Sequence, residues 1–376
     1  MIRLTVPSIG EEDLAAVSEI LASGYLVQGP RVREFEEQIA HIAGVRHAIA
    51  VSNGTAALHL AMLALDVRPG DLVAVTSYSW IATANVIELC GGQPVFIDID
   101  PGTFNMAPEA LFLTLNRLAE NKETIRRVKA VLPIHAFGQP ADMPAILRIA
   151  GDYQLPVIED AACALAARLH GRPAGSWATL GTFSFHPRKA ITTGEGGMVT
   201  TDNDAYARSI RALRNHGLDP ETSSPDFVVP GFNYRLTEFQ AALGLSQIKK
   251  LERIVNSRRC LAEKYKALLA DSPITAPAVL AGSEPAYQSY VCLLPAAQAP
   301  RRPAIIKALR ERGIETTIGT WHMPLTSYFR TRYGYRPGDF PVTDDVFARS
   351  IALPLYEGLT LENQQHVVRS LFEEIG

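Results

Sequence analysis

One lysine between a strand-like run and a glycine-rich turn is the first candidate for chemistry in this sequence. Lys189 lies in the stretch Gly181-Thr-Phe-Ser-Phe-His-Pro-Arg-Lys-Ala-Ile-Thr-Thr-Gly-Glu-Gly-Gly197. Phe183 and Phe185 favour a strand, Pro187 ends it because proline lacks a ladder donor, and the glycines permit a sharp return. We therefore expect Lys189 just past a strand end, at the edge where α/β folds bind ligands. A shielded lysine there can lose its proton and form a Schiff base with a carbonyl compound.

The second candidate is an anion site at a helix start. The residues Ser-Asn-Gly-Thr at 52–55 follow a strand-like run, 47–51, and lead into a helical run. Ser52 or Asn53 can cap this helix, Gly54 lets a ligand approach the backbone, and the free N–H groups with the helix dipole favour phosphate. An ordinary helix cap is the alternative. A P-loop and a dinucleotide fingerprint are excluded, because neither a Walker lysine nor Gly-x-Gly-x-x-Gly is present.

Two more strand ends carry a candidate group. Asp160 ends the run Val157-Ile-Glu-Asp, and a buried aspartate is costly to keep ionised unless a cation, such as a protonated ring nitrogen, faces it. A cap on a following helix is the alternative for Asp160. Trp80 follows the run 72–76, and its flat face can cover a planar ligand, although a tryptophan at a sheet edge more often packs.

Other polar residues at strand ends are interpreted without chemistry. Asp98 and Asp100 form an Asp-x-Asp pair, but no further acidic or histidine ligands cluster near it, so we interpret it as a solvated turn. His135 is interpreted as a core or edge residue. No metal site is expected.

The elements that must position these groups alternate along the chain. Strand-like runs are expected at 47–51, 72–76, 94–98, 128–134 and 156–159, with helices at 11–22, 32–43, 56–65, 82–89, 108–118, 143–150 and 204–214. This alternation predicts an α/β fold with a mostly parallel sheet covered by helices on both faces.

The length of the chain, 376 residues, favours one large domain plus a smaller one. A loop is expected over 223–230, and a long helix, 238–250 continued to 269, is expected to bridge the two domains. The later pattern of strands at 290–294 and 314–318 and helices at 303–312 and 361–374 indicates a small α/β domain. We therefore predict a large domain over 1–250 and a small C-terminal domain over 251–376.

The composition is that of an ordinary globular protein, with 47% hydrophobic and 20% charged residues. The formal net charge of -3 offers no bulk attraction for nucleic acid or an anionic membrane, so any anion must be held by a local site. Four cysteines without metal-ligand spacing are expected to be reduced. No signal peptide or membrane-spanning run is evident, and a cytoplasmic protein is expected.

Pyridoxal 5′-phosphate is the cofactor that needs all four strand-end groups. Its phosphate needs a helix N-terminus, its ring an aromatic face, its pyridinium nitrogen a carboxylate, and its aldehyde a lysine.

The motifs resemble those of the DegT/DnrJ/EryC1/StrS aminotransferases, from about Leu26 to Leu355. The motifs are Ser-Asn-Gly-Thr-Ala-Ala-Leu-His-Leu, Val-Ile-Glu-Asp-Ala-Ala, Thr-Thr-Gly-Glu-Gly-Gly-Met, Leu-Arg-Asn-His-Gly and Asn-Tyr-Arg-Leu-Thr-Glu-Phe-Gln-Ala-Ala-Leu-Gly. Members of this family are fold-type-I pyridoxal-phosphate enzymes that mostly aminate keto-sugars carried on nucleotides. The resemblance implies that fold, that cofactor and a ping-pong transfer from an amino acid, with L-glutamate expected as the donor.

The resemblance also implies roles for the three groups nearest the reaction. Lys189 would form the internal aldimine and move the proton between the donor Cα and C4′ of the cofactor. Asp160 would pair with the pyridinium nitrogen, and Trp80 would stack on the ring.

Five further residues would hold the phosphate or complete a shared site. The resemblance implies that the amides of Gly54 and Thr55, with Ser184, bind the phosphate. Asn233 and Arg235 resemble residues that reach the site of a neighbouring subunit, which implies a homodimer with shared active sites.

The chain departs from the family at two places. Cys163 stands where many relatives carry glutamine or histidine, so the expected contact to the ring hydroxyl is in question. The run Gly319-Thr-Trp-His-Met-Pro324 also differs, and it identifies no substrate. Two alternatives are a sugar dehydratase, which in this family tends to lack the lysine that is present here, and a cofactor-bound regulatory protein.

Overall fold

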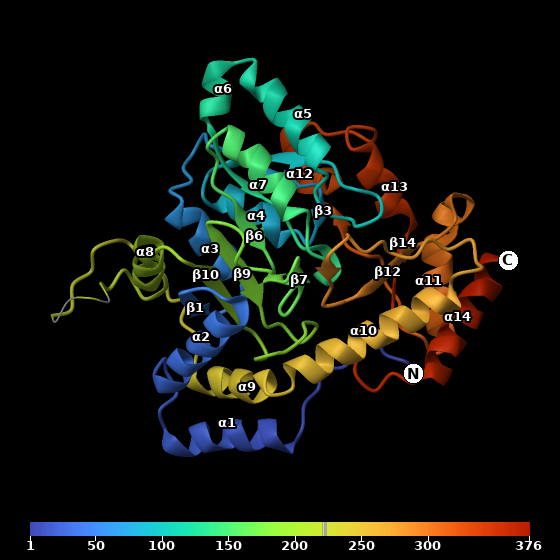
Figure 1. The fold of residues 1–376 in the computed structure, drawn as a ribbon, viewed down its shortest axis with the longest axis horizontal. Helices are drawn as coiled ribbons and strands as arrows, with labels where there is room; N and C mark the ends of the chain where they lie inside the picture. Colours follow the sequence, from blue (N-terminus) through green and yellow to red (C-terminus); the bar gives the residue numbers. More distant parts are fainter. Residues whose placement is uncertain (220, 222–223) are drawn as a thin grey trace.

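Two sheets meet edge to edge at the centre of the computed structural model, which describes residues 1–219, 221 and 224–376 (Figure 1). One has the strand order β1-β10-β9-β6 and the other the order β4-β2-β5. They are joined by parallel bridges from Val131 to Val157 and from Ile134 to Asp160. The strands of this central sheet are β1 His47–Val51, β2 Leu72–Thr76, β4 Gln93–Ile97, β5 Val128–Leu132, β6 Ile158–Asp160, β9 Leu180–Ser184 and β10 Gly197–Thr201.

The central sheet is mostly parallel, as the alternation predicted. β2 pairs in parallel with β4 and β5, and β6 pairs in parallel with β9. Only β10 runs against its neighbours, β1 and β9, among the described strands of this sheet. The carboxyl ends of β6 and β9 therefore lie at one edge, with Asp160 in register with Thr182.

Helices cover both faces of the central sheet, because its strands bury side chains on both sides. In β2, Val73 and Val75 join one hydrophobic cluster, whereas Leu72 and Ala74 join another. A third cluster joins Phe35 of α2 to Phe183 of β9. The helices of this part are α1 Glu11–Ser23, α2 Pro30–Ala43, α3 Gly54–Ala64, α4 Ala82–Leu89, α5 Pro108–Ala119, α6 Lys122–Arg126, α7 Met143–Asp152, α8 Asp204–Arg214 and α9 Glu238–Ile248.

The expected bridging helix is two helices, because the chain turns between Ile248 and Leu251, where α10 begins. Lys250 at this turn points to α1: its Nζ donates to Glu12 at 2.7 Å and to the backbone oxygen of Ser8 at 2.9 Å, and it also pairs with Asp13. The C-terminal part of the chain begins with α10 (Figure 1).

Its elements are α10 Leu251–Leu268, β12 Tyr290–Leu293, α11 Arg302–Glu311, β13 Trp321–His322, α12 Ser327–Tyr333, α13 Pro341–Arg349, β14 Ser350–Leu353 and α14 Leu361–Ile375.

The prediction of a strand at 314–318 was wrong. This segment makes only isolated bridges, from Ile314 to Ile2 and from Thr317 to Ala352. The antiparallel pair β12–β14 instead forms a small sheet, and its core includes residues of α10, α11 and α14. The part of the chain from β13 to the start of α13 packs elsewhere, because Phe329 and Phe340 contact Phe96 of the central sheet.

Short strands complete the described part of the chain: β3 Tyr78–Ser79 pairs with β13, and β7 Arg168–Leu169 pairs with β8 Arg172–Pro173 and β11 Ser283–Glu284. The loop predicted over 223–230 begins at Ser223, which lies outside the described residues. None of the described helices has the length and apolar character needed to cross a bilayer.

Candidate active site

Lys189 lies in a turn beyond β9, where the sequence predicted it. The backbone folds back on itself here. The N–H of Phe185 donates to the backbone oxygen of Gly196 at 2.8 Å, and the N–H of Lys189 donates to the backbone oxygen of His186 at 2.8 Å. The Lys189 side chain is half-buried, and its Nζ donates to Sγ of Cys163 at 3.1 Å. The amine is therefore partly shielded from bulk water, which suits a nucleophilic lysine.

Arg258 is a residue of this site that the sequence did not indicate. Its Nη2 donates to the backbone oxygen of Lys189 at 3.1 Å, and burial lowers the pKa of this guanidinium to about 10. It comes from α10, so the C-terminal part of the chain supports the turn that carries Lys189.

Asp160 is a buried carboxylate at the end of β6 and is 3% exposed. Oδ2 accepts from the hydroxyl of Thr83 at 2.8 Å, and Oδ1 accepts from the N–H of Ala162 at 3.2 Å. Burial raises the pKa of Asp160 above its ordinary value, although these hydrogen bonds and the charge of Lys189 favour the carboxylate. A cation seated against Asp160 would remove that penalty.

The alternative role of Asp160, a helix cap, was wrong. The residues that follow it form turns, and the next α-helix in the described chain is α8, at Asp204. The Ala162 contact is a local turn at the strand end.

The N-terminus of α3 lies against the end of β9. Asn53 caps this helix, its Oδ1 accepting from the N–H of Ala56 at 2.8 Å. A Cβ added at Gly54 would come within 2.8 Å of the Cβ of Ser184, so only glycine fits there. The amides of Gly54 and Thr55, in the first turn and without partners inside the helix, and the Ser184 hydroxyl are thus close together, which suits an anion.

Trp80 is 62% exposed, so the packing alternative does not apply to its indole. It follows β3, whose residue Ser79 pairs with Trp321 of β13. The hydroxyl of Ser79 lies 3.1 Å from that of Thr83, which contacts Asp160. The segment that presents Trp80 is thereby tied to the buried carboxylate.

Asn233 and Arg235 contact Asn215 rather than Lys189 or Asp160. Nη1 of Arg235 donates to Oδ1 of Asn215 at 2.6 Å, and Asn233 forms a bridge with Asn215. Within the described part of the chain, no hydrogen bond or ion pair links either side chain to Lys189 or Asp160.

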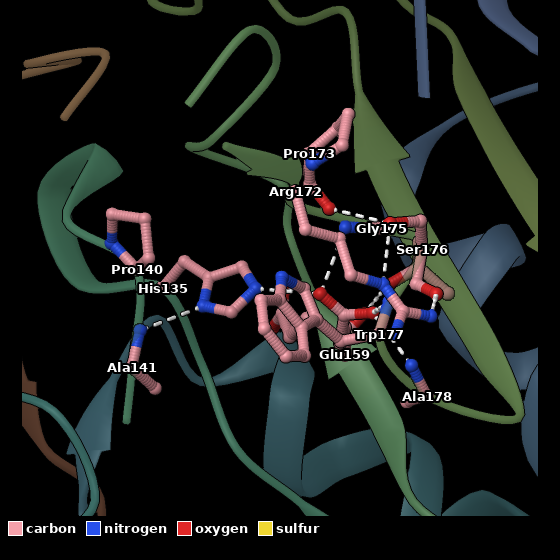
Figure 2. A network of polar contacts seen from close by, with 12 residues as sticks. His135, Pro140, Ala141, Glu159, Arg172, Pro173, Gly175, Ser176, Trp177 and Ala178 are labelled. Atoms are coloured by element: carbon pink, nitrogen blue, oxygen red, sulfur yellow. Dashed lines mark hydrogen bonds and ion pairs between the residues drawn. The ribbon is translucent and has the colours of Figure 1, made fainter. Parts of the chain in front are cut away.

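A buried network on the opposite side of β6 anchors the strand (Figure 2). Glu159 and His135 are fully buried, and Nε2 of His135 lies 2.9 Å from Oε2 of Glu159. Nδ1 of His135 accepts from the N–H of Ala141 at 3.0 Å, so the proton is on Nε2 and is donated to Glu159. Glu159 also accepts hydrogen bonds from the backbone N–H groups of Gly175, Trp177 and Ala178.

The Asp-x-Asp motif has a structural role. Asp98 accepts from the N–H of Val342 and Thr343 at 3.0 and 2.9 Å, in the first turn of α13. Asp100 accepts from Gly102 and Thr103, which forms the expected turn. Among the described residues no cluster of side chains suits a metal ion.

The residues at this edge fit pyridoxal 5′-phosphate. The buried Asp160 lacks a full cationic partner, the half-buried Lys189 offers an amine, and the close approach of Gly54 to Ser184 frames an anion site.

Comparison with known proteins agrees with this fit. The DegT/DnrJ/EryC1/StrS aminotransferase family matches residues 7–372. The chain is 36% identical to the uncharacterized protein MJ1066 of Methanocaldococcus jannaschii, over 97% of this chain and 95% of that protein.

Two solved structures resemble it closely. The first is Helicobacter pylori PseC, with a TM-score of 0.92 and 27% identity over 100% of this chain and 99% of that chain. The second is the PLP form of Spr1654 from Streptococcus pneumoniae, with a TM-score of 0.92 and 25% identity over 100% of this chain and 98% of that chain. The chain therefore belongs to the DegT/DnrJ/EryC1/StrS aminotransferase family and is a pyridoxal-phosphate-dependent aminotransferase.

Proposed function

We propose that this enzyme transfers the amino group of L-glutamate to a keto-sugar linked to a nucleotide, by a ping-pong mechanism. The observation that carries the proposal is the meeting of a half-buried amine, Lys189, and a buried carboxylate, Asp160, at one edge of the sheet. The relatives support a sugar as the acceptor: Spr1654 is described as a candidate sugar aminotransferase, and PseC as an aminotransferase of pseudoaminic acid biosynthesis.

The cofactor, when bound, supplies a ring that withdraws electrons from the carbon whose proton is exchanged. Asp160 would hold the positive charge at the ring nitrogen, because an anion with too few donors is stabilised by a cation. Gly54, Thr55 and Ser184 would hold the phosphate, and Trp80 would cover the ring and exclude water.

Lys189 would perform the proton transfer. Its Nζ would take the proton from Cα of the amino-acid donor and would deliver it to C4′ of the cofactor. Cys163 would hold this amine in place during the transfer, since the two atoms already lie 3.1 Å apart.

We further propose a cytoplasmic homodimer in which Asn233 and Arg235 reach the site of the partner subunit. Arg235 is held by Asn215 in a segment next to the anion site, because the N–H of Ser52 donates to the oxygen of Tyr234 at 2.8 Å. A residue on this side of α3 can contribute to a neighbouring site across a twofold axis.

The test is an absorbance spectrum of purified enzyme before and after addition of L-glutamate. A shift from the Schiff-base band to the pyridoxamine band, reversed by one member of a panel of nucleotide-linked keto-sugars, is the expected result. A spectrum that responds to neither L-glutamate nor L-glutamine would instead indicate the cofactor-bound regulatory protein.

A further inference from the structure

Cys163 and Lys189 form a sulfur–amine pair at the candidate active site. Nζ of Lys189 donates to Sγ of Cys163 at 3.1 Å, within the range of about 3–3.5 Å from which two aligned groups can react. Both residues are half-buried, so a small solute can reach the pair from solvent. The proposed mechanism gives the amine a reaction of its own, whereas it gives the thiol only a supporting contact.

Both residues of the pair are held through their backbones. A Cβ added at Gly138 would come within 2.9 Å of the backbone oxygen of Cys163, so the chain packs tightly against this turn. The turn that carries Lys189 is held by Arg258, whose Nη2 donates to the backbone oxygen of Lys189. The sulfur and the amine therefore meet from two separately anchored turns.

Arg258 also brings an unused donor to the pair. It is 2% exposed, and its Nε has no hydrogen-bond partner among the described residues. Burial lowers the pKa of Arg258 to about 10, and negative charge on Cys163 acts in the opposite direction, so the guanidinium lies within electrostatic reach of the sulfur. Positive charge near a cysteine favours the thiolate, which is the form that peroxides oxidise.

The other three cysteines lack this setting. Burial raises the pKa of Cys90 to about 11 and the pKa of Cys292 to about 12, so both stay thiols near neutral pH. Cys260 is exposed on α10, but among the described residues no hydrogen bond joins it to an amine. Cys163 is thus the cysteine whose oxidised form would meet a lysine already in place.

We propose that hydrogen peroxide joins Cys163 to Lys189 through a sulfur–nitrogen bond in the apoprotein and thereby blocks cofactor loading. The inference deepens the proposed function by assigning a redox control to the same site, and it rests on the role proposed there for Lys189. An amine bonded to sulfur cannot condense with the aldehyde of the cofactor.

The reaction has two steps that balance with hydrogen peroxide as the oxidant. The sulfur of Cys163 attacks one peroxide oxygen, the O–O bond breaks, and a sulfenic acid and water form. Nζ of Lys189 then attacks the sulfur, the S–O bond breaks, and the departing hydroxide takes up the amine proton as a second water. The pair loses two hydrogen atoms, and the peroxide is reduced to water.

A thiol reverses the link. Attack of a thiolate on the sulfur of Cys163 forms a mixed disulfide and releases the amine of Lys189, and a second thiolate then restores the thiol of Cys163. In the loaded enzyme the cofactor occupies the amine, so no link forms there. The pair therefore acts as a gate for cofactor loading that a peroxide closes and a thiol opens.

The direct test treats the full-length apoprotein with hydrogen peroxide and maps its peptides by mass spectrometry. We expect the peptides of Cys163 and Lys189 to be joined, with a mass about 2 Da below their sum, because two hydrogen atoms are lost. Cys260 is the internal control, and it should gain oxygen without being joined to a lysine. If Cys163 stays unlinked while Cys260 is oxidised, or is joined to another residue, the proposal is overturned.

Cofactor loading is measured on the same samples by absorbance after addition of pyridoxal 5′-phosphate. The fraction of chains that fails to load should equal the fraction that is linked. Dithiothreitol should restore loading, which an unfolded protein would not show. The loaded enzyme, given the same peroxide, should contain no link. Linked apoprotein that loads normally overturns the proposal.

Two cysteine variants locate the effect. Peroxide should leave the loading of Cys163→Ser apoprotein equal to that of the same variant without peroxide, while Cys260→Ser should stay as sensitive as the wild type. Sensitivity that persists in Cys163→Ser overturns the proposal. A link and a loading block in an enzyme that aminates no keto-sugar would refute the proposed function alone.

Discussion

The hydroxyl of Thr83 donates a 2.8 Å hydrogen bond to Oδ2 of Asp160, from the helix that follows β3 to the end of β6. The carboxylate is thereby oriented from a different part of the sheet than the one that carries it. The hydroxyl of Thr83 also lies 3.1 Å from the hydroxyl of Ser79, so hydrogen bonds link Asp160 to the segment that presents Trp80.

Thr83→Val should slow the donor half-reaction. A hydrogen bond to a charged group contributes about 1.5–3 kcal/mol, which corresponds to a rate loss of roughly tenfold or more. Thr83→Ser keeps the hydroxyl and should retain most of the rate. Stopped-flow absorbance after mixing with L-glutamate measures both, and a valine variant as fast as the wild type would mean that Thr83 only fills space.

Asp160→Asn should leave cofactor bound but slow proton transfer. A neutral amide cannot stabilise positive charge at the ring nitrogen, and the expected loss of transition-state stabilisation is on the order of several kcal/mol. Turnover and the cofactor content of the purified variant are the measurements. Near-normal turnover would remove Asp160 from the catalytic groups.

The same substitution should act in the opposite direction on the apoprotein. The pKa of Asp160 is raised in the folded state, so ionisation costs stability as pH rises through that folded value. Asp160→Asn apoprotein should therefore melt at a higher temperature than wild-type apoprotein near pH 7. The difference should vanish below the ordinary pKa of about 4, where both side chains are neutral. Thermal melts of the two apoproteins across this pH range provide the check, and a constant difference at every pH contradicts it.

Borohydride should attach the cofactor to Lys189, because only an imine at that residue is reduced to a stable amine. Peptide mapping of the reduced, yellow enzyme measures the site of the label. Lys250 serves as an internal control, since it is held by Glu12 and Asp13. A label on another lysine, or none, would disprove the assignment.

Mixed dimers test the shared site. A Lys189→Ala chain and an Asn233→Ala/Arg235→Ala chain are each expected to be weak or inactive alone. In a mixed dimer one site receives both defects and the other neither, so random pairing should restore roughly a quarter of all sites. Co-expression followed by activity assay and mass spectrometry measures this, and mixed dimers without activity would show that Asn233 and Arg235 act within their own chain.

Local patterns predicted the sheet well. The runs at 47–51 and 72–76 and the helices at 82–89 and 204–214 have the predicted bounds, because strand and helix periodicity are properties of neighbouring residues. The prediction failed at 314–318, where the partners are single residues of the N-terminal segment and of β14. It also missed the turn between α9 and α10, which Lys250 stabilises through contacts more than 200 residues away in sequence.

The site was predictable to a similar extent. Lys189 and Asp160 could be found because each follows a strand-like run. Thr83 and Arg258 could not be assigned, because their roles depend on contacts between distant segments and no local motif surrounds them. His135 was interpreted as a core or edge residue, and it is fully buried. The fully buried pair of His135 and Glu159 shows that a histidine at a strand end can be structural.

Glu159 and Asp160, the two consecutive carboxylates of β6, differ in the groups that satisfy their charge. This difference sets the order in which the protein folds and binds its cofactor. Glu159 obtains all its donors from the chain itself, three backbone N–H groups and His135, so its charge is satisfied as soon as the sheet has formed. Asp160 is left with a hydroxyl and one N–H. Folding can therefore finish before the cofactor arrives, and loading becomes a separate, later step that completes a preformed receptor.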